Sequence, residues 1–190
     1  MTKFVITAGH DSVKDPGAVS TLNGVQYTEA KLMTELRNLV KFYLEKVGHT
    51  VISDGTGDTN KVLREAIALI PQGIVAVELH LNAATTKTAK GVETIGNSKH
   101  KDICIKLSNA IADVLETTVR RENGYFDYSK VGRTLGYVKA GGIIVEGFFI
   151  TNDNELQTYF NKKWLVARAI ARTLHNHYSE GDFDELFNKA

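Results

Sequence analysis

The sequence predicts an α/β domain of three layers, with a twisted, mostly parallel central sheet of about six strands flanked by helices. Short apolar runs alternate along the chain with longer stretches whose apolar residues recur at three- and four-residue steps. The first pattern is typical of buried parallel strands and the second of amphipathic helices. A length of 190 residues, 43% of them hydrophobic and 24% charged, is typical of one globular domain.

In the first half of the chain, glycine and proline separate the two patterns. Gly9 bounds the first apolar run, Gly48 stands where a helix would end, and Pro71 ends the next helical stretch. The polar residues between the first strand and the first helix predict a loop. The predicted elements are a strand over residues 4–8, a helix over 28–47, a strand over 50–52, a helix capped by Asp58 or Thr59, and a strand over 74–79.

The second half continues the alternation. Asn152 followed by Glu155 predicts a capping box at the start of the last helix, whose apolar stripe includes Trp164 and Tyr178. The acidic residues after Glu180 carry little pattern, so we expect a catalytic domain over residues 1–178 and a C-terminal tail or linker over 179–190. The other predicted elements are a strand over 91–95, a helix over 99–118, a loop over 119–128, and strands over 135–138 and 142–145.

Composition excludes several classes of protein. The formal net charge of +1 gives no basic excess for binding nucleic acid or an anionic membrane. No apolar run approaches the roughly 20 residues of a membrane span, and the N-terminal residues do not resemble a secretory signal. Cys104 is the single cysteine, which excludes an intramolecular disulfide and a Cys-rich zinc site. We therefore expect a chain without an export signal, and assume a monomer.

Ionisable side chains follow three of the predicted buried strands. His10 comes after the first, His80 after the strand over 74–79, and Glu146 after the strand over 142–145. The carboxyl ends of parallel strands meet at one edge of a sheet, where ligands bind in such folds. Two imidazoles and a carboxylate are a ligand set of catalytic zinc sites. Spacing alone does not choose the carboxylate, and the candidates are Glu29, Glu78, Glu93, Asp11 and Asp15.

Glu78 has a second interpretation. It lies two residues before His80, so both side chains point to the same face of the predicted strand. In that position Glu78 is either a rival metal ligand or a partner that orients the His80 imidazole.

Four motifs occur in the order found in a known family. They are Ile6–His10 with Asp15–Ala18, Thr28–Ala30, Glu78–Ala83 with Gly91–Thr94, and Val145–Asn152. With these motifs the chain resembles the zinc-dependent N-acetylmuramoyl-L-alanine amidases, a family that includes bacterial autolysins and phage endolysins. The resemblance spans about residues 4–175. Many members carry Ser at the position of Glu78, and residues 119–130 match no family motif that we can assign.

The resemblance implies a site and a reaction. His10, Glu29 and His80 would bind Zn²⁺, and Glu146 would be the catalytic carboxylate. The substrate would be peptidoglycan, cleaved at the amide between N-acetylmuramic acid and the L-alanine of the stem peptide. Because no export signal is recognised, we expect a phage endolysin that stays in the host cytoplasm until lysis. The alternatives are a zinc peptidase that cuts another cell-wall peptide bond and a wall-binding module without catalysis.

Overall fold

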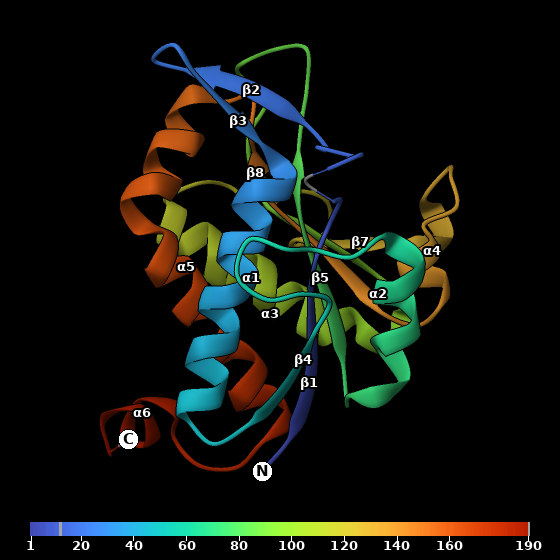
Figure 1. The fold of residues 1–190 in the computed structure, drawn as a ribbon, viewed down its shortest axis with the longest axis vertical. Coiled ribbons are helices and arrows are strands. Elements are labelled where there is room, and N and C mark those ends of the chain that lie inside the picture. Colours follow the sequence, from blue (N-terminus) through green and yellow to red (C-terminus); the bar gives the residue numbers. More distant parts are fainter. Residues whose placement is uncertain (12, 190) are drawn as a thin grey trace.

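The structure, a computed structural model, describes residues 1–11 and 13–189 and confirms the predicted three-layer α/β fold (Figure 1). The last residue of the predicted tail, Ala190, lies outside the described residues. A six-stranded sheet forms the middle layer, in the order β4-β1-β5-β8-β6-β7. Its strands are β1 (Lys3–Ala8), β4 (Thr50–Ser53), β5 (Ala76–Asn82), β6 (Glu93–Gly96), β7 (Tyr125–Asp127) and β8 (Ile143–Phe149).

The sheet is parallel except at one junction. Strands β4, β1, β5 and β8 pair in parallel, whereas β6 is antiparallel to β8 and β7 is parallel to β6. The buried residues of β1, β5 and β8 are mostly apolar because helices cover both faces of the sheet, and the buried Glu78 is the charged exception in β5. Their carboxyl ends lie together at the top of Figure 1, which is the edge where the candidate residues were expected.

Three long helices cover one face of the sheet: α1 (Glu29–Lys46), α3 (Lys101–Leu115) and α5 (Asp153–Tyr178). Each presents an apolar stripe at helical spacing, for example Leu32, Leu36, Val40 and Leu44 in α1, which are all nearly inaccessible to solvent. Burying one such leucine contributes about 1.5–3 kcal/mol, so these stripes hold the helices to the sheet.

The opposite face carries two short helices, α2 (Leu63–Leu69) and α4 (Gly136–Lys139), and the 3₁₀ turns η1 (Ile70–Gln72), η2 (Ser98–His100) and η3 (Tyr128–Lys130) lie in the connecting segments. Ala66 and Tyr137 from the two short helices pack with Val5, Ala76 and Ile144 of the sheet in a second, smaller core.

Several predicted elements differ from the structure. The strand predicted over 135–138 is wrong, because these residues form the turn of helix α4, whose Tyr137 and Val138 are both buried. The loop predicted over 119–128 contains β7. Helix α2 begins only at Leu63, and Thr59 caps no helix because its hydroxyl donates to the carbonyl of Thr56. Strand β5 continues to Asn82, so His80 lies inside it.

The polar segment before α1 is a β-hairpin that we did not predict. Strands β2 (Val19–Leu22) and β3 (Val25–Thr28) pair antiparallel around Asn23 and Gly24. Both turn residues have positive φ angles, 51° and 77°, as a two-residue type I′ turn requires. The hairpin projects above the carboxyl edge of the sheet and leads directly into α1 (Figure 1).

The start of α5 agrees with the capping prediction in part. The Asn152 side chain accepts hydrogen bonds from the backbone N–H groups of Asn154 and Glu155. The Glu155 carboxylate does not return to Asn152 but accepts from the N–H groups of Gly91 and Phe149, which ties α5 to the sheet. Trp164, predicted on the buried stripe, is 48% exposed.

Residues 179–189, predicted as a tail or linker, carry helix α6 (Phe183–Lys189). Phe183 is fully buried in the main core beside His175. His175 and His49 share a hydrogen bond of 2.8 Å, and burial lowers the pKa of His49 to about 4. The Thr2 hydroxyl lies 2.7 Å from that of Ser179. The first and last segments of the chain therefore meet at the edge of the sheet opposite the hairpin (Figure 1).

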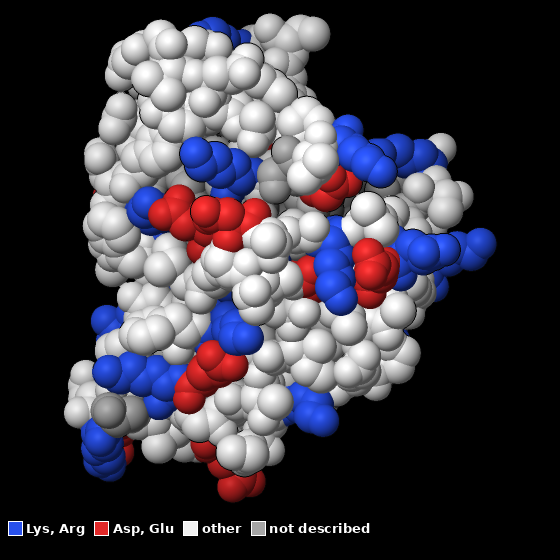
Figure 2. All heavy atoms as spheres, viewed as in Figure 1, with Lys and Arg blue, Asp and Glu red and all other residues white. Residues whose placement is uncertain are grey.

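No helix among residues 1–11 and 13–189 is long and apolar enough to cross a membrane. On the face shown in Figure 2, the described basic and acidic side chains are interspersed, in agreement with the small net charge.

We expect α6 to contribute to folding. Phe183→Ala removes a fully buried aromatic ring and should lower the free energy of unfolding by about 3–5 kcal/mol, as large-to-small core substitutions do. Leu186→Ala in the same helix is the matched control, because Leu186 is 36% exposed and its removal should cost much less. Urea denaturation measures both variants, and equal stabilities would show that residues 179–189 behave as a linker.

Candidate metal centre

The fold brings His10, His80 and Glu146 to one region. His10 follows β1 after Gly9, while His80 and Glu146 lie on the neighbouring strands β5 and β8. His80 and Glu146 are direct partners in the parallel register of these strands, so their side chains lie next to each other on the same face.

Helix α1 supplies Glu29 from its first turn. The Thr28 side chain caps this helix by accepting a hydrogen bond from the N–H of Lys31. The buried Glu29 carboxylate accepts one hydrogen bond from the N–H of Ala18 and another from the N–H of Leu81, each of 2.9 Å. These contacts join the hairpin, the helix and β5 at a single side chain.

Both imidazoles contact the same carboxylate. His10 Nε2 lies 3.2 Å from Glu29 Oε2, and His80 Nδ1 lies 2.9 Å from Glu29 Oε1. Ligand atoms of the three residues all lie within 4.8 Å of one another, a separation that a single metal ion can bridge. The donor set, two imidazole nitrogens and a carboxylate oxygen, is that of catalytic zinc sites with three protein ligands.

The second nitrogen of each imidazole contacts another carboxylate. His10 Nδ1 lies 2.9 Å from Asp15 Oδ2, and His80 Nε2 lies 3.0 Å from Glu78 Oε2. Histidines that bind a metal usually donate their other N–H to such a group, which fixes the tautomer and the ring orientation. The surroundings of both histidines therefore fit a metal centre.

Glu29 is the carboxylate that contacts both histidines. Asp15 contacts only His10, and Glu78 contacts only His80. Two other candidates named from the sequence have different partners. Asp11 accepts from the N–H groups of Val13 and Lys14, and Glu93 binds Asn82, Arg120 and Arg121.

The mutual contacts shift the pKa values of the cluster. Burial opposes the charge of Glu29, but hydrogen bonds from His10 and His80 outweigh it and lower the pKa of its carboxyl well below the usual range. The hydrogen bond to Glu29 raises the pKa of His10. For His80, burial lowers the pKa, and the contacts with Glu29 and Glu78 raise it by more. The Glu29 carboxylate is therefore kept ionised between the two imidazoles.

Glu146 differs from the other carboxylates. It is partly buried, and its Oε2 atom is closed off from solvent without a hydrogen-bond partner among the described residues. Burial raises the pKa of Glu146 to about 7, against the opposing effect of nearby His80. A carboxyl group that titrates near neutral pH and lines a cleft is suited to accept and return a proton.

Two glycines allow the close approach of these groups. A Cβ atom at Gly9 would lie 2.1 Å from Cε1 of His80, so only glycine leaves room for that imidazole above the backbone. Gly17 has a φ of 67°, and a Cβ there would lie 2.6 Å from the His10 ring. These contacts give a physical reason for glycine at both positions of the first motif.

The cluster lies in a cleft of about 620 Å³. Its lining also includes Lys61, Arg133 and Tyr137, of which the first two bring positive charge to the same cleft as the acidic cluster. Sequence reasoning did not single out these residues, nor the buried pair formed by Arg37 and Asp54 behind β1. A signal was present for that pair, because Arg37 falls on the apolar stripe of α1 and Asp54 directly follows a strand.

Comparison with known proteins identifies the family. Residues 4–176 match the family described as N-acetylmuramoyl-L-alanine amidase, which is nearly the whole chain. The chain belongs to this family. Its members act on peptidoglycan, and the fold is that of an N-acetylmuramoyl-L-alanine amidase. No protein of curated function matches the sequence.

Solved structures agree with this assignment. A candidate N-acetylmuramoyl-L-alanine amidase from Neisseria meningitidis is 39% identical with a TM-score of 0.83, over 93% of this chain and 95% of that chain. An N-acetylmuramoyl-L-alanine amidase from Clostridium difficile 630 is 23% identical with a TM-score of 0.77, over 95% and 98%. The catalytic domain of the CD27L endolysin, which targets Clostridia difficile, is 23% identical with a TM-score of 0.64, over 93% and 98%. The last two likenesses concern the fold alone.

Proposed function

We propose that this amidase uses zinc, held by His10, Glu29 and His80, to hydrolyse the amide between N-acetylmuramic acid and the L-alanine of the stem peptide. The observation that carries the proposal is the position of Glu29 between two imidazoles, with Glu146 beside them. A zinc ion supplies a Lewis acid that polarises the scissile carbonyl and makes water a stronger nucleophile.

In this proposal Glu146 moves the proton. Its carboxylate, which lines the cleft, accepts a proton from the attacking water while the water oxygen forms a bond to the carbonyl carbon. The same carboxyl group then gives the proton to the amide nitrogen as the carbon–nitrogen bond breaks. The products are the lactyl carboxylate of the sugar and the free amine of L-alanine. A pKa of about 7 for Glu146 suits both transfers.

Asp15 and Glu78 orient the two imidazoles. Each accepts from the ring nitrogen that faces away from Glu29, so the other nitrogen is the one that would bind the metal. Glu78 is therefore proposed as a positioning residue and not as a ligand.

The role as a phage endolysin stays a prediction. Similar structures include a bacterial amidase and an endolysin catalytic domain on the same fold. The proposed chemistry is compatible with either role. Lysis of a host on expression together with a pore-forming membrane protein, compared with expression alone, tests this role.

Digestion of purified peptidoglycan tests the reaction. The proposal expects new L-alanine amines in proportion to the lactyl carboxylates released. Another new amine would indicate a zinc peptidase that cuts within the stem peptide. Binding to the wall without any new terminus would indicate a module that lacks catalysis.

The ligand assignment predicts one zinc ion per chain. His80→Ala and Glu29→Ala should each abolish stoichiometric zinc, measured by metal analysis after dialysis. Glu78→Ala should keep one zinc but weaken its binding by roughly 10–100-fold, because the ring of His80 loses its partner. His100→Ala is the control, since His100 bonds to the carbonyl of Gly141 away from the cluster. Loss of zinc in Glu78→Ala together with retention in Glu29→Ala would reverse the two roles.

The role of Glu146 predicts that activity and metal binding separate. Glu146→Gln keeps the shape of the side chain but cannot carry a proton, so the hydrolysis rate should fall by about 10²–10⁴-fold. Zinc content and melting temperature should stay near those of the parent, as in the exposed control Glu180→Gln. If Glu146 only orders the loop that follows β8, the glutamine variant remains active and melts at a lower temperature.

A further inference from the structure

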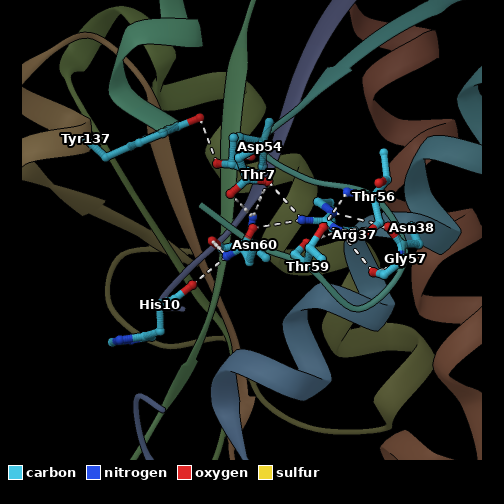
Figure 3. A network of polar contacts seen from close by, with 12 residues as sticks. Thr7, His10, Arg37, Asn38, Asp54, Thr56, Gly57, Thr59, Asn60 and Tyr137 are labelled. Carbon is cyan, nitrogen blue, oxygen red and sulfur yellow. Dashed lines mark hydrogen bonds and ion pairs between the residues drawn. The ribbon is translucent and has the colours of Figure 1, made fainter. Parts of the chain in front are cut away.

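A buried polar network lies directly behind His10 and has no part in the proposed chemistry. Arg37 of α1 and Asp54 after β4 are both inaccessible to solvent and form an ion pair of 3.1 Å (Figure 3). A buried guanidinium is stable only when its N–H groups are paired. Arg37 also donates to Asn38 Oδ1, Asn60 Oδ1 and the carbonyl of Thr59.

The network bonds to both backbone polar groups of Ala8, the last residue of β1. The Asp54 carboxylate accepts the N–H of Ala8 at 3.2 Å, and the Asn60 side chain donates through Nδ2 to the carbonyl of Ala8 at 2.7 Å. The same Nδ2 donates to the carbonyl of His10. Because Arg37 donates to Asn60 Oδ1 at 2.8 Å, the carboxamide can turn only its NH₂ group toward β1 (Figure 3).

His10 needs such support because of its backbone. Its φ angle is 67°, in the left-handed region that a residue with a side chain adopts at a cost of roughly 1–3 kcal/mol. The residue stands beyond the end of β1, where the hydrogen bonds of the sheet no longer fix it. The imidazole position depends on this conformation, since a change in φ would swing the ring away from Glu29.

We propose that Asn60 is a positioning residue that holds His10 in its left-handed conformation, with Arg37 fixing the orientation of the Asn60 carboxamide. The His10 imidazole is thereby held in place beside Glu29 in the metal-free protein. The consequence for metal affinity rests on the proposed zinc site, whereas the effect on the backbone of His10 does not.

The experiment compares Asn60→Ala with Asn38→Ala. Both remove a carboxamide that accepts from Arg37, but only Asn60 bonds to β1. Backbone ¹⁵N relaxation of the metal-free protein should give order parameters for Gly9 and His10 near 0.85 in the parent and in Asn38→Ala, and below about 0.6 in Asn60→Ala. Chelator competition should show a zinc dissociation constant raised about 10-fold in Asn60→Ala only.

Melting temperatures separate positioning from general destabilisation. A similar decrease in both variants, with mobility at His10 and weaker zinc binding confined to Asn60→Ala, supports the proposal. Unchanged order parameters at Gly9 and His10 in Asn60→Ala overturn it, even if the parent binds zinc. If the parent binds no zinc but His10 becomes mobile in Asn60→Ala, the positioning role stands and the proposed metal site fails.

Discussion

The buried carboxylate of Glu29 is the contact on which the arrangement of the cleft depends. It bonds to the backbone N–H of Ala18 at the end of the first motif, to that of Leu81 in β5, and to the imidazoles of His10 and His80. A charged group inside a protein is stable only when it is paired and fully hydrogen-bonded. Each segment that contributes a partner is therefore held in place by the same requirement.

The fold class and the main strands could be predicted because burial imposes a simple pattern. The strands β1, β5 and β8 are mostly apolar because helices cover both of their sides, and α1 and α3 carry apolar stripes at helical spacing. The positions of His10, His80 and Glu146 followed from the rule that parallel strands end at one edge. The choice of Glu29 did not, and came from resemblance to a family.

Other features depend on contacts that periodicity does not report. The segment that forms α4 predicts a strand because residues 135–138 are a short apolar run. Short buried helices have the same pattern, and in α4 both Tyr137 and Val138 are buried. His49 directly follows the glycine at the end of α1, where a polar residue is typically exposed, but it is buried and forms a hydrogen bond with His175, far away in sequence. The β2–β3 hairpin had a local signal that we overlooked, since Asn23-Gly24 is the favoured pair for a type I′ turn. The roles of Arg37 and Asn60 also need three-dimensional contacts, because their partners come from three separate segments.

The meeting of the first and last segments has a practical consequence for a polymeric substrate. Thr2, next to the start of β1, is in contact with Ser179, and both chain ends lie at the bottom of Figure 1, the edge where the parallel strands begin. The cleft is lined by residues at the carboxyl ends of β1, β5 and β8. A fluorescent label, a surface tether or a fused domain attached at either described end would extend away from the cleft. A glycan strand could then enter the cleft from solution while the protein stays immobilised by either end.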